Sequence, residues 1–500
     1  MSQTEITFPN LFRNKYFILM TVIVAAAAVG MAGSLGPLIP LGVVVSLYLV
    51  VLLFRRPDFN VILIAFIIYT NTAVVLSKFH GVPQTVGYSL PLLLLIPLIW
   101  HLFVHKRKIK INFVFILMIL YLSVMIMGSA FSRDVNLAMP NVINYVVEGL
   151  GLYFLLINTI RTPKLLKQVV WALLIAGTLM GGLSLYQQIT GTFDNNYGGF
   201  AQVDTGFITE ESIQGNVVQP RVSGPVGEKN RYAQVMSMLV PLGLFQAWGA
   251  QSKKLRLTAL ILTGLIIVGA TLAFSRGAQV GFLILIITMA LMRYIKIREL
   301  LITLGAVVLL LIAFPQITQR FSTLGDIFSS KEEGGIRNTD GSIQGRATEM
   351  LAALLVFRDH PIVGVGPGMF RYEMEEYSKI ISLKNITGER QAHSLYPGVA
   401  AETGILGFVT LMGIFFYTLY RLNIARAYWL GRNQTGMANL CTGFFLAIIS
   451  YMTTGIFLHL AFIRYLWLII ALAVIASEFR ESDVPTEMDI AGKELDKVEG

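Results

Sequence analysis

The chain has 500 residues, of which 55% are hydrophobic and only 14% are Asp, Glu, Lys or Arg, whereas about a quarter of the residues are charged in ordinary soluble domains. With a mean hydropathy of +0.67, this composition excludes a soluble enzyme and a disordered chain. The single cysteine, Cys441, excludes an internal disulfide and a cysteine metal cluster.

Long apolar runs follow one another from near the N-terminus. A helix that crosses the roughly 30 Å hydrocarbon core needs about 20 apolar residues, so we interpret fourteen of these runs as membrane spans. In chain order they are 17–33, 35–54, 59–76, 86–104, 111–131, 137–160, 166–189, 231–249, 256–273, 276–292, 299–315, 396–420, 436–457 and 463–479. The sequence therefore predicts an all-α polytopic membrane protein of about 14 transmembrane helices.

Lysine and arginine are distributed unevenly between alternate connections of these spans. One set of short connections holds twenty cations, and the opposite set holds only Lys78, Arg133, Arg276 and Arg464. By the positive-inside rule the cation-rich side is cytoplasmic, so we expect both termini inside and the two long loops outside. The net charge of +10 is then explained by topology, and we expect no nucleic-acid partner.

This topology divides the chain into six segments. They are spans 1 to 7 (1–189), an extracytoplasmic loop (190–230), spans 8 to 11 (231–315), a large extracytoplasmic loop (316–395), spans 12 to 14 (396–479) and a cytoplasmic tail (480–500). The tail is polar and acidic and lacks apolar periodicity, so we expect it to be disordered.

The first polar cluster at a predicted membrane boundary is R-V-S-G-P-V-G-E-K-N-R-Y-A, from Arg221 to Ala233. Its glycines and proline allow close approach of the backbone, and Arg221 and Arg231 carry planar forks that match a phosphate. Two interpretations are open: recognition of a phosphate, or ordinary contacts of loop arginines with lipid headgroups.

The second cluster is S-R-G-A at 275–278, in a tight outer turn between two predicted spans. Arg276 fits a snorkelling arginine at the membrane interface, but a helix that begins there also offers free N–H groups and a positive dipole end to an anion. Proximity of Arg221 and Arg276 in the fold would favour the anion site.

The large outer loop contains a predicted amphipathic helix over 344–357, with Ala347, Leu351, Leu354 and Leu355 on its apolar face. We expect this helix to lie on the membrane or to cap the bundle, and to end at Asp359-His360-Pro361. The following G-V-G-P-G-M-F at 364–370 is interpreted as a tight structural turn, because no predicted strand precedes it and a proline interrupts the pattern.

His393 and Glu402 lie at the end of this loop and in the next span, about 2.5 helical turns apart if the segment is helical. The imidazole can accept a proton near neutral pH, and the carboxylate can orient a partner or an acceptor hydroxyl; the alternative is a merely amphipathic interfacial histidine. Glu148, near the middle of the sixth span, is a separate charge without an evident partner.

Together these residues resemble the O-antigen ligase and O-antigen polymerase family of bacterial envelope glycosyltransferases. The matching positions are Arg221, Gly224, Asn230 and Ala233; Ser275 to Ala278; Gly345 and Arg346; His360 to Phe370; and His393, Ala401, Glu402, Gly404 and Gly407. The resemblance covers roughly residues 215–410. Two positions depart from the family pattern: Lys229 stands where Pro is common, and Ser394 follows His393 directly where Asn is common.

The resemblance implies a GT-C-like fold and transfer of a glycan from an undecaprenyl-pyrophosphate carrier to an acceptor hydroxyl, at the periplasmic face of the bacterial inner membrane. It implies an inverting single displacement without metal or cofactor. We expect Arg221 and Arg276 to clamp the pyrophosphate and His393 to act at the acceptor hydroxyl. Four further residues are expected to bind substrate: Asn230, Arg231, Arg346 and Glu402.

Three functions remain open. We favour a polymerase of O-antigen or exopolysaccharide, because fourteen spans and a long loop exceed what is usual for family ligases. The alternative within the family is a ligase that transfers the glycan to the lipid A core. The alternative from another class is a lipid-linked oligosaccharide flippase, which charges deep in several spans would favour, whereas this sequence shows chiefly Glu148.

Overall fold

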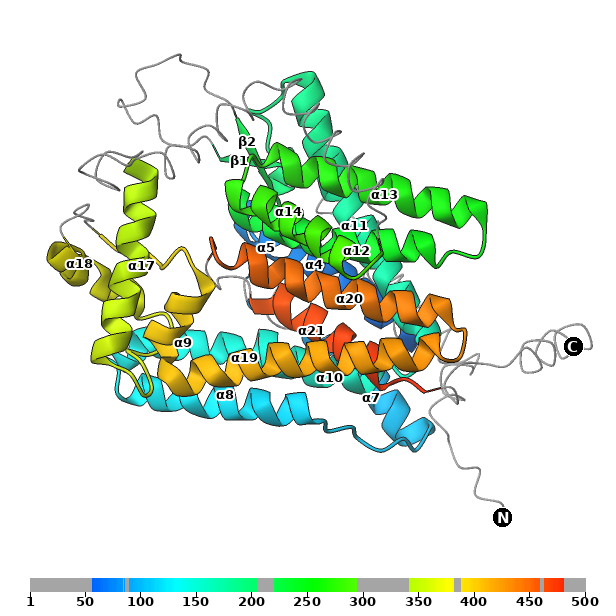
Figure 1. Cartoon of the computed structure of the whole chain (residues 1–500), viewed down its shortest axis with the longest axis horizontal. Helices are drawn as coiled ribbons and strands as arrows, with labels where there is room; N and C mark the ends of the chain where they lie inside the picture. Colours follow the sequence, from blue (N-terminus) through cyan, green and yellow to red (C-terminus); the bar gives the residue numbers. More distant parts are fainter. Residues whose placement is uncertain are drawn as a thin grey trace, which may run out of the picture.

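The computed structural model describes residues 56–83, 85, 90–204, 220–294, 341–381, 388–458 and 463–480. Many of the long helices run along the long axis of the molecule (Figure 1). The elements of the first part are α4 (Pro57–Tyr69), α5 (Thr72–His80), η2 (Leu90–Leu94), α7 (Leu95–Ile99), η3 (Trp100–Val104), α8 (Phe113–Ala130), α9 (Val135–Asn144), η4 (Tyr145–Gly151), α10 (Leu152–Thr159), α11 (Pro163–Thr190) and η5 (Tyr197–Gly199).

The second part contains a short sheet and the remaining helices. These are β1 (Gln202–Asp204), β2 (Arg221–Gly224), α12 (Lys229–Trp248), α13 (Lys253–Leu272), α14 (Arg276–Leu291), α17 (Gly341–Asp359), α18 (Phe370–Ile381), α19 (Leu395–Leu430), α20 (Thr435–Thr454) and α21 (Ile463–Glu478). Eight predicted spans coincide with one helix each: 111–131, 166–189, 231–249, 256–273, 276–292, 396–420, 436–457 and 463–479. Span 59–76 is divided between α4 and α5, which bend by 58°, and span 137–160 runs through α9, η4 and α10. Span 86–104 is described from residue 90 and consists of η2, α7 and η3, whereas the runs at 17–33, 35–54 and 299–315 lie outside the described residues.

Capping residues in the sequence mark where several helices begin. The side chains of Asn112, Thr162 and Ser252 accept hydrogen bonds from the third amide that follows each of them, at the starts of α8, α11 and α13. Each cap satisfies one of the free amides of a first turn, and its loss typically costs about 1 kcal/mol. Gly191 ends α11 in the left-handed conformation, with φ of 68°.

Six described helices are long and apolar enough to cross a membrane, and the bent pair α4 and α5 makes a seventh if it counts as one span. The six are 113–130, 135–159, 163–190, 253–272, 395–430 and 435–454. The all-α membrane fold is therefore confirmed. Fourteen spans and a GT-C-like architecture stay predictions.

The core of the bundle is formed around α12, α20 and α21. α12 packs against α13 and α20, and α21 packs against α10, α19 and α20. The side chains from Tyr465 to Ala473 on α21 are fully buried. Close helix contacts use glycine: a methyl group at Gly269 of α13 would lie 2.7 Å from Cα of Gly181 on α11, which is how small residues let membrane helices approach.

α17 and α18 form an outer layer at one end of the bundle (Figure 1). α17 ends at Asp359 as predicted, but the face that it buries against the protein is not its predicted apolar face. Thr348, Glu349, Ala352, Ala353 and Val356 are buried, whereas Leu351 and Leu354 are 41% and 51% exposed. The small alanines face inward because α17 packs closely against α18 and α19.

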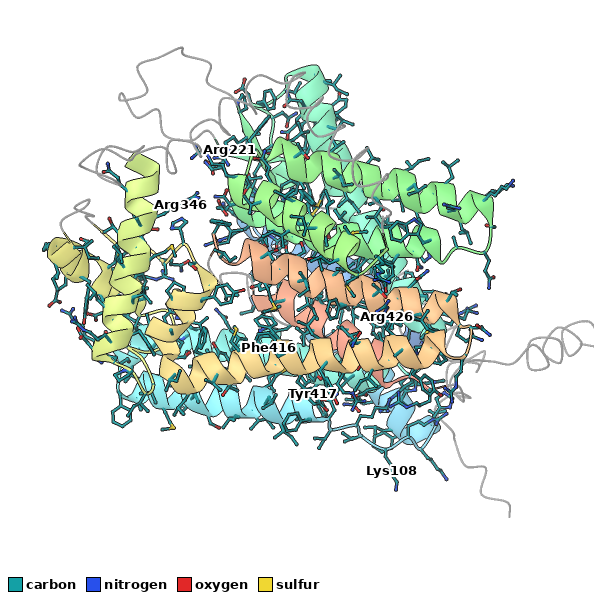
Figure 2. All side chains as sticks on the ribbon, in the orientation of Figure 1. Lys108, Arg221, Arg346, Phe416, Tyr417 and Arg426 are labelled. Carbon is teal, nitrogen blue, oxygen red and sulfur yellow. The ribbon has the colours of Figure 1, made fainter. Side chains whose placement is uncertain are left out.

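β1 and β2 pair in antiparallel register, which the sequence did not predict. Val203 lies opposite Val222 and Asp204 lies opposite Arg221. The pairing fixes Arg221 just before α12, at the end of the molecule that also carries Arg346, while Lys108 and Arg426 lie toward the other end (Figure 2). Which end faces the cytoplasm, and the segment boundaries given above, stay predictions.

Candidate functional site

Arg221 leads into α12 through a turn that the local sequence specifies. Gly224 has φ of 51°, a left-handed conformation that favours glycine. Glu228 then caps α12, since its carboxylate accepts hydrogen bonds from the amides of Asn230 and Arg231 at 3.0 and 2.8 Å. A carboxylate also suits the positive end of a helix dipole. This cap fixes the position of the first turn of α12.

The guanidinium of Arg221 reaches the turn that carries Arg276. Nε donates to the carbonyl of Ala273 at 3.1 Å, and Nη2 donates to that of Phe274 at 2.8 Å. These are carbonyls at the end of α13, and Arg276 is the first residue of α14. The structure thus brings Arg221 to the two residues that precede the S-R-G-A turn. Joint binding of an anion by the two heads stays a prediction.

His393 is held by a buried carboxylate. Its Nδ1 lies 2.6 Å from Oε2 of Glu349, whose side chain is 2% exposed, while the histidine side chain is 35% exposed. Arg390 Nη1 lies 3.7 Å from the other oxygen of Glu349. A carboxylate on one ring nitrogen fixes the orientation of the imidazole. Glu349 is a candidate site residue that sequence reasoning missed, since it looked like part of the polar face of α17.

Glu402 is not the partner of His393. Its carboxylate accepts hydrogen bonds from the amides of Gly368 and Phe370 at the start of α18. The glycine loop therefore presents these two amides to a protein carboxylate, in keeping with its interpretation as a structural turn.

The same loop docks on a break in α19. Gly404 has φ of 63° and ψ of −167° inside this helix, and a methyl group there would overlap the carbonyl of Ile362. The amides of Val365 and Gly366 donate to the carbonyls of Ala401 and Glu402, both at 3.0 Å. The break thus exposes backbone carbonyls that anchor the outer layer to the bundle.

Two adjoining cavities lie at this end of the molecule. The larger, of about 400 Å³, is lined by residues that include Tyr121, Asn144, Glu148, Arg231, Arg371, Gln391, Glu402 and Trp467. The smaller, of about 290 Å³, is lined by Glu228, Asn230, Arg231, Glu389, Arg390, Gln391, His393 and Leu458. Arg231 and Gln391 line both and are hydrogen bonded to each other at 3.3 Å, so the cavities meet at this pair.

The predicted substrate-binding residues differ in where they lie. Asn230 and Arg231 line the smaller cavity beside His393, and Arg231 and Glu402 line the larger. Asn230 also donates from Nδ2 to Glu228 at 2.9 Å, so it supports the helix cap. Arg346 lies one turn before Glu349 on α17. Arg221, Arg276 and Arg346 are not among the residues that line these two cavities.

Glu148 has a partner that the sequence did not reveal. Its Oε1 lies 3.2 Å from Nη1 of Arg464, and both side chains are mostly buried. Glu148 belongs to η4, a π-helical turn between α9 and α10; such turns are frequent at functional sites. The pair joins η4 to α21, and Glu148 also lines the larger cavity.

Residues 233–412 match a family model described as O-antigen ligase. No curated protein sequence matched the chain. The matched segment begins in the first turn of α12 and ends in α19, so it includes α14, α17, α18, the glycine loop and His393. Within the described residues, no group of three or more His, Cys, Asp or Glu side chains is placed to hold a metal ion.

Proposed function

We propose that this chain, whose residues 233–412 match a family model described as O-antigen ligase, transfers a glycan from an undecaprenyl-pyrophosphate-linked donor to a hydroxyl of an acceptor. The observation that carries this proposal is the 2.6 Å contact between His393 and the buried Glu349, beside a cavity that also contains Arg231 and Arg390. An oriented base next to cations suits attack on a carbon with an anionic leaving group.

His393 acts at the acceptor hydroxyl. Nε2 takes the hydroxyl proton while the oxygen attacks the anomeric carbon of the donor. The bond from that carbon to the pyrophosphate oxygen breaks, and the pyrophosphate leaves with the electron pair. A single displacement of this kind inverts the anomeric centre. Glu349 stabilises the imidazolium that forms, because its carboxylate contacts Nδ1.

Arg221 and Arg276 receive the pyrophosphate at the S-R-G-A turn, in place of a divalent cation. Two of the five N–H groups of Arg221 hold the carbonyls of Ala273 and Phe274, which fixes the plane of the guanidinium. Arg276 adds a second cation at the N-terminus of α14, where backbone amides favour an anion. Arg346, Asn230, Arg231 and Glu402 contact the glycans around this centre.

The active site faces the periplasm across the bacterial inner membrane. This proposal rests on the uneven distribution of cations between alternate connections. Its test is a cysteine at Lys379, 61% exposed on α18, in a chain with Cys441→Ala. A membrane-impermeant maleimide should label K379C in intact spheroplasts. Labelling only after lysis would reverse the orientation.

The acceptor decides between two members of the family. We favour a polymerase, which extends a second lipid-linked glycan; a ligase acting on the lipid A core is the second candidate because the matching family is described as O-antigen ligase. Purified full-length protein in nanodiscs, given the lipid-linked repeat unit alone, should produce a ladder of longer glycans. A single product that appears only when lipid A core is added would establish the ligase, and no product with either acceptor would overturn glycan transfer.

A further inference from the structure

The larger cavity contains two arginines that come from separate parts of the fold. Arg231 lies in the first turn of α12, and Arg371 is the second residue of α18. Both line the 400 Å³ cavity, and their guanidinium groups are close enough to repel each other. Like charges that share a partly buried space raise the free energy of the folded state.

Arg371 makes no ion pair with a described carboxylate, although Glu402 attracts it. Its Nε is buried and makes no hydrogen bond within the described part of the chain. No described carboxylate lies within 4.0 Å of its guanidinium, and the nearest aromatic contact is the ring of Tyr372 at 6.0 Å. Arg371 therefore has hydrogen-bond donors to offer to the cavity.

The carboxylates that face this cavity are already engaged. Glu402 attracts Arg371, but it accepts hydrogen bonds from the amides of Gly368 and Phe370. Glu148 is paired with Arg464. Glu228 lies 3.8 Å from Nε of Arg231 while it caps α12. Two guanidinium groups thus share one cavity, an arrangement that an anionic ligand would stabilise.

We propose that Arg231 and Arg371 form an anion-binding site in the larger cavity, for a phosphate or carboxylate group carried by a glycan substrate. The identity of that substrate rests on the proposed function. The site is separate from the turn of Arg221 and Arg276, which lines neither cavity. Through Arg231 and Gln391 it adjoins the cavity of His393, so it holds the charged end of a substrate beside the reacting hydroxyl.

The test measures the thermal unfolding midpoint of the full-length protein in nanodiscs as each of three probes is titrated: inorganic pyrophosphate, undecaprenyl pyrophosphate and sodium glucuronate. Wild type, Arg371→Gln and Arg371→Lys are compared, with Arg358→Gln as the matched control because Arg358 is 68% exposed on the same outer layer. Each protein is also measured with Arg276→Gln, which removes the other proposed pyrophosphate site.

We expect at least one probe to raise the midpoint of the wild type, and R371Q to weaken its apparent affinity by about tenfold to a hundredfold. R371K should also bind more weakly, since lysine lacks the planar fork. Without ligand, R371Q should be at least as stable as the wild type, because one of two repelling charges is gone. If Arg371 had only a structural role, R371Q would instead lower the unfolding midpoint without ligand.

The probes identify the source of the anion. A response to both pyrophosphate probes assigns the site to the carrier, and a response to glucuronate alone assigns it to an acidic sugar. The proposal is overturned if no probe stabilises the wild type, if R371Q binds as tightly, or if R371Q unfolds earlier without ligand. Glycan transfer by the same samples tests the proposed function separately, because the unfolding midpoints of R371Q are measured without any turnover.

Discussion

Polar residues have different roles in two regions of the molecule. One region is the core around α12, α20 and α21, and the other is the outer end, the end of the bundle that carries α17, α18 and the candidate site. In the core, uncharged hydroxyls make the polar contacts, either within one helix or between neighbouring helices: Ser237 donates to Ala233 at 2.6 Å, and Tyr69 donates to Val235 at 2.6 Å. At the outer end, polar contacts join elements far apart in the chain, as Glu349 does with His393 and Arg221 does with Phe274.

The backbone differs in the same way. Within the described residues, the core helices α12 and α20 contain no left-handed backbone, whereas the outer end contains the break at Gly404, the π-helical turn η4 and three glycines with positive φ in one loop. We infer that the apolar core contributes most of the stability. The end of the molecule that carries α17 and α18 contains cavities and like charges, which favour ligand binding rather than stability. Substitutions in the two regions should therefore have separable effects.

The largest effect is expected at His393. His393→Ala should slow glycan transfer by about 10²–10⁴, the usual cost of removing a general base, while donor binding remains near that of the wild type. Transfer kinetics and donor binding by purified protein check this. His105→Ala, an exposed histidine toward the other end, should leave both unchanged. Loss of donor binding with turnover would move His393 to the pyrophosphate site.

The next effect concerns the core alone. Leu239 on α12 is fully buried, so Leu239→Ala should lower the free energy of unfolding by about 2–5 kcal/mol, with the activity of the remaining folded protein retained. Unfolding in detergent measures the first and transfer per folded molecule the second. Leu260→Ala, on the 40% exposed face of α13, is the control. A loss of activity per folded molecule in L239A would show that the core and the site cannot be perturbed separately.

Gly404 links the two regions. Gly404→Ala should cost at least about 1–3 kcal/mol from the left-handed backbone, with further loss because the methyl group overlaps Ile362. Activity should fall with stability, since the displaced loop leads into α18, which carries Arg371. Gly182→Ala on α11 adds a methyl group into open space and should be neutral or stabilising. Normal activity in G404A would show that the break is not needed to place the outer layer.

Glu349 acts through His393 and should have a smaller effect. Glu349→Gln should lower the turnover rate by about 10- to 100-fold, as for residues that orient a functional histidine, with little change in donor affinity. Separate measurement of turnover and donor binding checks this. Glu375→Gln, exposed and paired with Lys379 on α18, is the matched control. A wild-type turnover rate in E349Q would show that the contact between Glu349 and His393 is structural and does not assist glycan transfer.

The smallest effect is expected from chelation. If arginines neutralise the leaving group, EDTA should not change the rate of glycan transfer by the purified protein. A loss of rate that magnesium or manganese restores would replace the arginine mechanism with a metal-assisted one.

Much of the architecture follows from the sequence because it depends on local patterns. Apolar runs of span length locate the helices of the described chain, and caps such as Thr162 mark where they begin. The short motifs from Arg221 to Gly407 indicated the family before the fold was known, and the matched residues 233–412 overlap most of the region of the resemblance, roughly 215–410.

The assembly of the site depended on tertiary structure. The sequence determined which charged residues lie near membrane boundaries, because their positions follow from hydropathy. It did not determine that His393 pairs with Glu349, that Glu402 caps the glycine loop, or that Arg371 shares a cavity with Arg231. Each of these contacts joins residues more than 30 positions apart, and only helix packing and the break at Gly404 bring them together.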